Sequence, residues 1–171
     1  KAGGEIAMAV SELVLPEFNL IKGLRIGTAC AGIKKQGRKD LVVFELAEGS
    51  TTAGVFTLNA FCAAPVQVAR QHLQAATPRY FIINTGNANA GTGSLGLADA
   101  KQPCAAVADL TEVTAQEVLP FSTGVIGEPL PMPRLLAALP QALATLSEAG
   151  WADAATGIMT TDTLPKGATT R

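Results

Sequence analysis

The chain has 171 residues, 48% of them hydrophobic, and a formal net charge of −1. This length and apolar content are enough to bury a substantial core, so a disordered chain is excluded. The near-neutral charge, with no basic block longer than the cluster at residues 34–39, argues against an electrostatic nucleic-acid surface and favours a small-molecule partner.

The first third of the chain is predicted to be rich in β-structure. Glycines at 23 and 32 are expected to turn the chain between short strands, and β-branched runs at 41–46 and 52–57 predict two stronger strands. We expect these two strands to pair as a hairpin. The basic cluster at 34–39 is expected to be a solvated hairpin turn rather than a phosphate site.

A helix opened by Pro65 follows, and Val66, Ala69 and Leu73 recur at the spacing of its sheet-facing side. This helix carries His72, the only histidine of the chain. No acidic residue lies nearby in the sequence to orient the imidazole, so we expect an exposed helix residue rather than a catalytic base.

An apolar run at 79–83 predicts a buried strand, and it leads directly into a segment rich in asparagine and glycine at 84–93. Such a segment supplies amide donors and positions that tolerate the left-handed conformation. Two interpretations remain open. The segment is either an internally bonded functional loop or a plain surface turn.

The second half of the chain is predicted to be mainly helical. A helix is expected over 97–113, with Pro103 marking a break or a late start, and a capping box is expected at 114–117. An apolar helical stripe at 135–146 is predicted to be core, with a kink at Pro140, and a last helix is predicted to end near Gly157.

Two polar segments interrupt this half. The stretch 120–128 runs from apolar residues into Ser122, Thr123 and Gly124, whose hydroxyl and backbone donors suit a developing negative charge. The alternative is a glycine turn whose hydroxyls cap backbone groups. Residues 160–163, Thr-Thr-Asp-Thr, either start another turn or hold a polar ligand.

The cysteines at 30, 62 and 104 are widely spaced and odd in number, which indicates neither a disulfide framework nor a zinc site. No apolar run approaches the ~18 residues of a membrane span, and the N-terminus lacks a secretion signal pattern. We therefore expect a cytoplasmic protein with reduced thiols, no metal or cofactor, and no nucleic-acid or membrane partner.

Three uncommon motifs, at 84–90, 119–127 and 157–163, together resemble the bacterial glutamate N-acetyltransferase family, also called ornithine acetyltransferase. The resemblance runs from about residue 15 to residue 166, in the order of the family. It implies a mixed α/β fold of layered sheets and helices, completed by a second chain. It also implies two parts of this chain, an N-terminal extension at 1–14 and an α-chain domain at 15–171.

The resemblance further implies an arginine-biosynthesis enzyme that moves acetyl from N-acetylornithine to glutamate by a ping-pong route. Members of the family cut one precursor at an Ala-Thr bond, and the freed threonine of the β chain becomes the nucleophile, with its own amine as base. By motif, Thr123 and Gly124 resemble the oxyanion hole and Thr160 a substrate-binding threonine. An α₂β₂ assembly is expected, and acetyl-CoA is a possible further donor.

The sequence ends at Arg171, before the family's cleavage-site motifs, so we expect an α subunit that is inactive without the β chain. Two other functions remain open. A self-cleaving amidase or aminopeptidase uses the same chemistry with water as acceptor, and a non-catalytic binding domain would also contain loops rich in glycine and asparagine.

Overall fold

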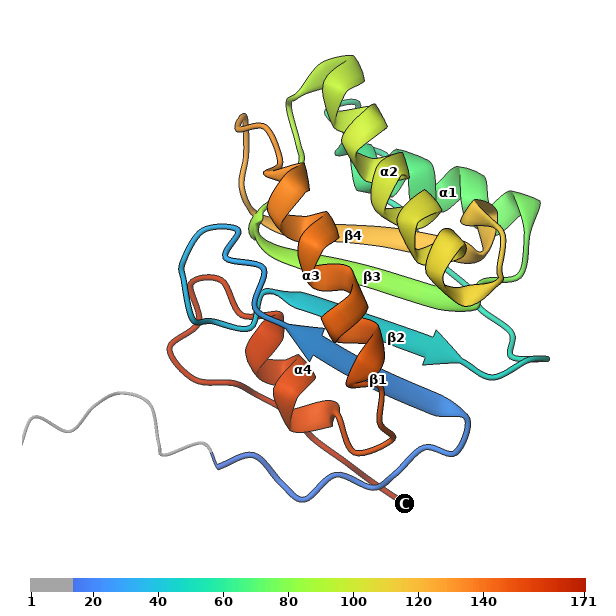
Figure 1. The fold of residues 1–171 in the computed structure, drawn as a ribbon, viewed down its shortest axis with the longest axis vertical. Coiled ribbons are helices and arrows are strands. Elements are labelled where there is room, and N and C mark those ends of the chain that lie inside the picture. Colours follow the sequence, from blue (N-terminus) through green and yellow to red (C-terminus); the bar gives the residue numbers. More distant parts are fainter. Residues whose placement is uncertain (1–13) are drawn as a thin grey trace, which may run out of the picture.

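The computed structural model describes residues 14–171 and contains one four-stranded sheet with helices packed on it (Figure 1). The strands are β1 (Leu24–Ala29), β2 (Leu41–Leu46), β3 (Tyr80–Asn87) and β4 (Val118–Val125), in the spatial order β1-β2-β3-β4. The pairs β1–β2 and β2–β3 are antiparallel, whereas β3–β4 is parallel. The expected mixed α/β class is confirmed. The expected N-terminal extension at 1–14 lies, except for Val14, outside the described residues.

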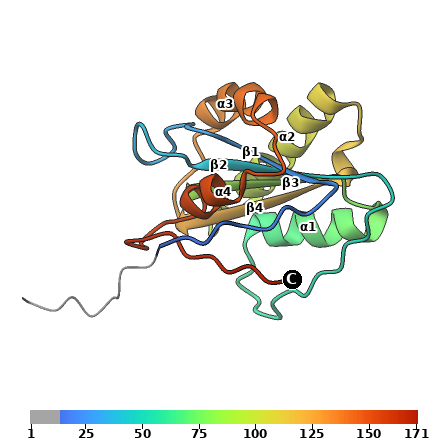
Figure 2. The ribbon, with the colours of Figure 1, turned by 90° about the horizontal axis from the view of Figure 1, so that it is seen from below.

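Four helices surround this sheet: α1 (Ala64–Ala75), α2 (Gly93–Thr111), α3 (Met132–Ala144) and α4 (Trp151–Gly157). In the turned view, α2 and α3 lie above the sheet, with α1 and α4 below them (Figure 2). A short 3-10 turn, η1 (Ala115–Glu117), precedes β4 and has the predicted capping box between Thr114 and Glu117. The parallel pair β3–β4 therefore has α2 as its crossover helix.

The core is built on both faces of β2, because successive side chains of a strand point to opposite faces. Leu41 and Val43 pack with residues of α2 and α3, whereas Val42 packs with α4. The predicted apolar stripe of α3 is confirmed as core by Leu135 and Leu139, which are almost completely buried. Helix α4 ends at Gly157, as predicted.

The predicted hairpin between 41–46 and 52–57 is wrong. Strand β2 has the predicted bounds, but it pairs with β1 on one edge and β3 on the other. Both edges of β2 are therefore occupied, and residues 52–57 form no strand. Val55 and Leu58 in this region are fully exposed. The β-branched residues at 52–57 favour a strand, but no neighbouring strand within the described residues is available to pair with them.

Two helix predictions also need correction. Helix α2 begins at Gly93, earlier than predicted, and continues through Pro103, which lies buried inside it. In α1 the buried positions include Val68 and His72, while Val66 and Leu73 are only half-buried. Nδ1 of His72 lies 2.8 Å from the carbonyl oxygen of Val118. His72 is thus a buried residue that ties α1 to β4, not an exposed one.

None of the described helices is long and apolar enough to cross a membrane. All three cysteines belong to the described residues and are free thiols, with Cys30 exposed and Cys104 buried. Burial raises the pKa of the Cys104 thiol to about 12. That thiol therefore stays protonated in the core and packs as a small apolar side chain.

Candidate functional site

The site is built where the parallel strands β3 and β4 end side by side. Their register pairs Asn84 with Ser122, Thr85 with Thr123 and Gly86 with Gly124, and an irregularity follows at Asn87. The segment expected to be a loop from residue 84 onward is thus strand as far as Asn87. The stretch expected to turn at Thr123 and Gly124 is likewise the end of β4, and positive φ recurs just after it at Gly127 (+77°).

Gly86 and Gly124 bring the two backbones unusually close. Their φ angles are +94° and +137°, values that side chains of L-residues rarely adopt. A Cβ atom on Gly124 would lie 2.3 Å from the carbonyl carbon of Gly86 and 2.5 Å from the amide nitrogen of Asn87. Only glycine therefore fits at position 124, and its backbone is left exposed beside Thr123.

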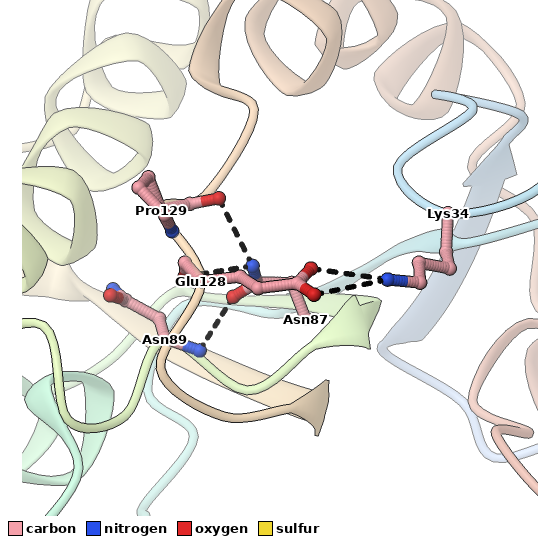
Figure 3. Close-up of polar contacts among 5 residues, drawn as sticks. All are labelled: Lys34, Asn87, Asn89, Glu128 and Pro129. Atoms are coloured by element: carbon pink, nitrogen blue, oxygen red, sulfur yellow. Dashed lines mark hydrogen bonds and ion pairs between the residues drawn. The ribbon is translucent and has the colours of Figure 1, made fainter.

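Three asparagines hold the strand ends from the inside, and all three are buried. Nδ2 of Asn84 donates to the carbonyl of Asn87 at 2.8 Å, and Asn89 Nδ2 donates to the carbonyl of Gly96 at 2.8 Å. Nδ2 of Asn87 donates to the carbonyls of Glu128 and Pro129, each at 3.1 Å, and its Oδ1 accepts the Asn89 N–H at 2.7 Å (Figure 3). The asparagines serve as an internal scaffold, so the surface-turn interpretation is wrong.

A cavity of about 330 Å³ opens at these strand ends. It brings together all three residues predicted to form the site, because Thr123, Gly124 and Thr160 line it. The other lining residues come from the β1–β2 connection, from β3 and β4, and from the segment after α4: Lys34, Lys35, Arg38, Asp40, Thr85, Gly86, Val125, Met159 and Thr161.

Thr160 reaches this cavity because α4 is held against the sheet. Gly157, the last residue of α4, sits so close to β2 that a Cβ there would lie 2.6 Å from Cγ2 of Val42. Oγ1 of Thr85 donates to the carbonyl of Gly157 at 3.0 Å, and the Arg38 guanidinium donates to the carbonyl of Met159. These bonds fix the chain on either side of Ile158, immediately before Thr160.

The ionisable residues that line the cavity are three cations, Lys34, Lys35 and Arg38, and one carboxylate, Asp40. The oxygens of Asp40 already accept the N–H groups of Ala31 and Ile33, each at 2.6 Å. The predicted role of the basic cluster as a solvated turn is therefore only half right. It does join β1 to β2, but it also forms a wall of the cavity. The sequence shows these basic residues, but it does not show that they face the cavity.

No group of three or more histidine, cysteine, aspartate or glutamate side chains able to hold a metal ion occurs within residues 14–171. His72 does not line the cavity. What the site presents is hydroxyl groups, backbone at Gly124 and positive charge. Such an arrangement stabilises a developing oxyanion and attracts an anionic ligand.

The ArgJ family model matches residues 25–171. The chain is 60% identical over 161 residues to the arginine biosynthesis bifunctional protein ArgJ of Pseudomonas fluorescens, which covers 94% of this chain and 40% of that protein. The protein of the same name from Methylococcus capsulatus is 60% identical over 151 residues, covering 88% of this chain and 37% of its own length. The chain thus spans about 40% of the length of such relatives.

Two solved structures are similar in fold. An ornithine acetyltransferase of Mycobacterium tuberculosis, solved in complex with ornithine, has a TM-score of 0.78 and 40% identity, covering 84% of this chain and 78% of its own. The arginine biosynthesis bifunctional protein ArgJ of Bacillus halodurans has a TM-score of 0.74 and 33% identity, with coverage of 84% and 75%. The match over residues 25–171 and these likenesses establish the relationship. The chain belongs to the ArgJ family.

Proposed function

We propose that this chain is the α subunit of an acetyltransferase that moves acetyl from N-acetylornithine to glutamate. The observation that carries the proposal is the single cavity lined by Thr123, Gly124 and Thr160. Thr123 and Gly124 are adjacent and Thr160 follows 36 positions after Gly124, and all three were expected to contact the same substrate. Their meeting in one cavity supports a shared role in acyl transfer.

The proposed reaction uses two half-steps on a threonine nucleophile supplied by a β chain. The threonine oxygen attacks the acetyl carbonyl and its proton passes to the threonine's own amine, which later protonates the departing ornithine amine. The amine of glutamate then attacks the resulting acetyl ester, and its proton passes by way of the threonine amine to the departing threonine oxygen, which frees N-acetylglutamate and restores the hydroxyl. In both half-steps the hydroxyl of Thr123 and the N–H of Gly124 donate to the tetrahedral oxyanion.

Two relatives support the choice of reaction and substrate. The Pseudomonas fluorescens protein is named for arginine biosynthesis and described as bifunctional, and the Mycobacterium tuberculosis structure is an ornithine acetyltransferase holding ornithine. The bifunctional description favours acetyl-CoA as a second acetyl donor. We further propose that this chain works in an α₂β₂ assembly.

The experiment is intact-mass analysis of the natural complex before and after exposure to N-acetylornithine. We expect a second chain that begins with threonine and gains one acetyl group, which glutamate then removes as N-acetylglutamate. Acetate release without any need for glutamate would favour the amidase alternative. Absence of any acetyl-enzyme in the complete complex would overturn the proposal in favour of a binding domain.

A further inference from the structure

Lys34 occupies a particular place beside the two glycines of the site. A Cβ atom on Gly86 would lie 2.8 Å from Cβ of Lys34, so the lysine stem packs directly over Gly86. Gly86 is in turn the register partner of Gly124. The side chain of Lys34 therefore starts next to the residues expected to bind the oxyanion.

The backbone that carries Lys34 is firmly held even though the side chain is exposed. The buried carboxylate of Asp40 accepts the N–H groups of Ala31 and Ile33, at 2.6 Å each. The carbonyl of Gly32 accepts a hydrogen bond from Nη1 of Arg134 at 3.0 Å. A cation on such a base loses less conformational entropy on binding a ligand than one on a free loop.

The ammonium end of Lys34 is directed across the strand ends toward Glu128. Nζ of Lys34 lies 3.1 and 3.4 Å from the two carboxylate oxygens of Glu128 (Figure 3). The backbone of Glu128 is held by Asn87, whose Nδ2 donates to its carbonyl. The buried Asn87 thereby fixes the backbone of the residue with which Lys34 pairs.

This ion pair contributes little to folding. Both side chains are about half exposed, at 50% and 53%, and water weakens the attraction of exposed ion pairs. An ammonium group has three N–H donors, so it has capacity for a second carboxylate beside Glu128. Together with Lys35 and Arg38, Lys34 makes the wall of the cavity positive, which favours an anionic ligand there.

We propose that Lys34 binds the carboxylate of the amino-acid substrate in this cavity. The inference rests on the proposed function, because N-acetylornithine and glutamate both carry an α-carboxylate. In this proposal Lys34 is a specificity-determining residue that selects carboxylate-bearing substrates. The carboxylate that Lys34 binds belongs to the acetyl donor, to the acceptor, or to each in its own half-reaction.

The test compares two acetyl donors that differ only in this carboxylate, N-acetylornithine and N-acetylputrescine, using the complete enzyme with both chains. Lys34→Met keeps the apolar stem over Gly86 but removes the charge. Since a hydrogen bond to a charged group is lost, we expect kcat/KM for N-acetylornithine to fall about 10- to 100-fold, mainly through KM. The variant should use N-acetylputrescine as well as the wild type does.

Lys39→Met is the matched control. Lys39 also belongs to the basic cluster and pairs with a carboxylate, that of Asp153, but it does not line the cavity. Its loss should change neither donor's kinetics. Competitive inhibition by ornithine and by putrescine provides a second readout, and Lys34→Met should weaken inhibition by ornithine alone.

The outcomes are distinct. If only the KM of glutamate rises in Lys34→Met, the carboxylate belongs to the acceptor, and the proposal holds for that half-reaction. If both donors lose activity equally, or if neither donor, acceptor nor inhibitor responds, the proposal is overturned. A wild-type complex that transfers no acetyl from N-acetylornithine counts against the proposed function itself, and the assignment of Lys34 falls with it.

Discussion

Ser122 and Thr123 are adjacent hydroxyl residues at the end of β4 with opposite surroundings. Oγ of Ser122 donates to Oδ1 of the buried Asn84 at 2.5 Å, whereas Thr123 is exposed, lines the cavity and makes no side-chain hydrogen bond to the described residues. Within the described residues, the Thr123 hydroxyl therefore makes no hydrogen bond that would cap a backbone group. Of the two hydroxyl residues, the one without a side-chain hydrogen bond in the described part of the chain is the one that lines the cavity.

The first prediction concerns Thr123→Ala in the complete enzyme. Acetyl-enzyme formation and precursor cleavage should slow together, by about 10²- to 10³-fold, because each passes through an oxyanion that loses one donor. The free energy of unfolding should change by no more than about 0.5 kcal/mol, since no described bond is lost. Rapid-quench acylation and denaturant unfolding provide the two measurements.

Ser122→Ala is the control for that prediction. Removing this hydroxyl takes a donor from the buried oxygen of Asn84, which should cost about 1–3 kcal/mol of unfolding free energy. Acylation should be much less affected than in Thr123→Ala. The prediction fails if the two variants lose stability and acylation rate in the same proportion.

The second prediction concerns the close approach of β3 and β4 at Gly124. Gly124→Ala places a methyl group against the backbone of Gly86 at a φ of +137°. The left-handed conformation costs about 1–2 kcal/mol and overpacking adds about 1–3 kcal/mol. Gly127→Ala is the control, because Gly127 also has a positive φ, +77°, but no atom within 4 Å of the added Cβ. Equal losses of unfolding free energy would contradict the steric argument.

The third prediction concerns Thr160, which lines the cavity on the side of Arg38 and Met159. Thr160→Val should mainly raise KM for N-acetylornithine, because the hydroxyl is expected to contact the amino-acid part of the substrate rather than the reacting carbonyl. Thr163→Val, an exposed position outside the cavity, should leave both constants unchanged. A collapse of kcat with constant KM would instead place Thr160 in transition-state stabilisation.

The fourth prediction concerns the phenol of Tyr80, which donates to Oε1 of Glu45 at 2.8 Å. Burial and this hydrogen bond raise the pKa of Tyr80 from 10.0 to about 12. The folded state thus holds the proton more tightly than the unfolded state. This stabilisation is fully present below pH 10 and is lost as the pH rises toward 12. The free energy of unfolding should fall over that window.

Tyr80 is the only tyrosine of the chain, so the ultraviolet absorbance of phenolate reports its titration directly. Glu45→Gln removes the negative charge beside the phenol and should lower the pKa of Tyr80. In Tyr80→Phe, the part of the fall in unfolding free energy above pH 10 that comes from this phenol should disappear. If the phenol of the folded wild type titrated at its ordinary pKa, the role assigned to Glu45 would be wrong.

Local sequence determined the elements whose own pattern was strong. The apolar run 41–46, the proline-opened helix α1, the capping box at Thr114 and the end of α4 at Gly157 all lie where predicted. In each case the signal comes from residues that are only a few positions apart in the sequence. The motifs also indicated Thr123, Gly124 and Thr160 as site residues, although nothing in the spacing required them to share one cavity.

Only the tertiary structure decided which strands pair, that His72 is buried and that three cations of the basic cluster at 34–39 line the cavity. Residues 52–57 have the composition of a strand but no free neighbour, whereas asparagine and glycine at 84–87 extend β3 because β4 pairs with them. Lys34 faces the site because Asp40 holds the backbone of the preceding Ile33 and the lysine stem packs on Gly86. These outcomes depend on contacts between residues far apart in the chain, which local propensity does not encode.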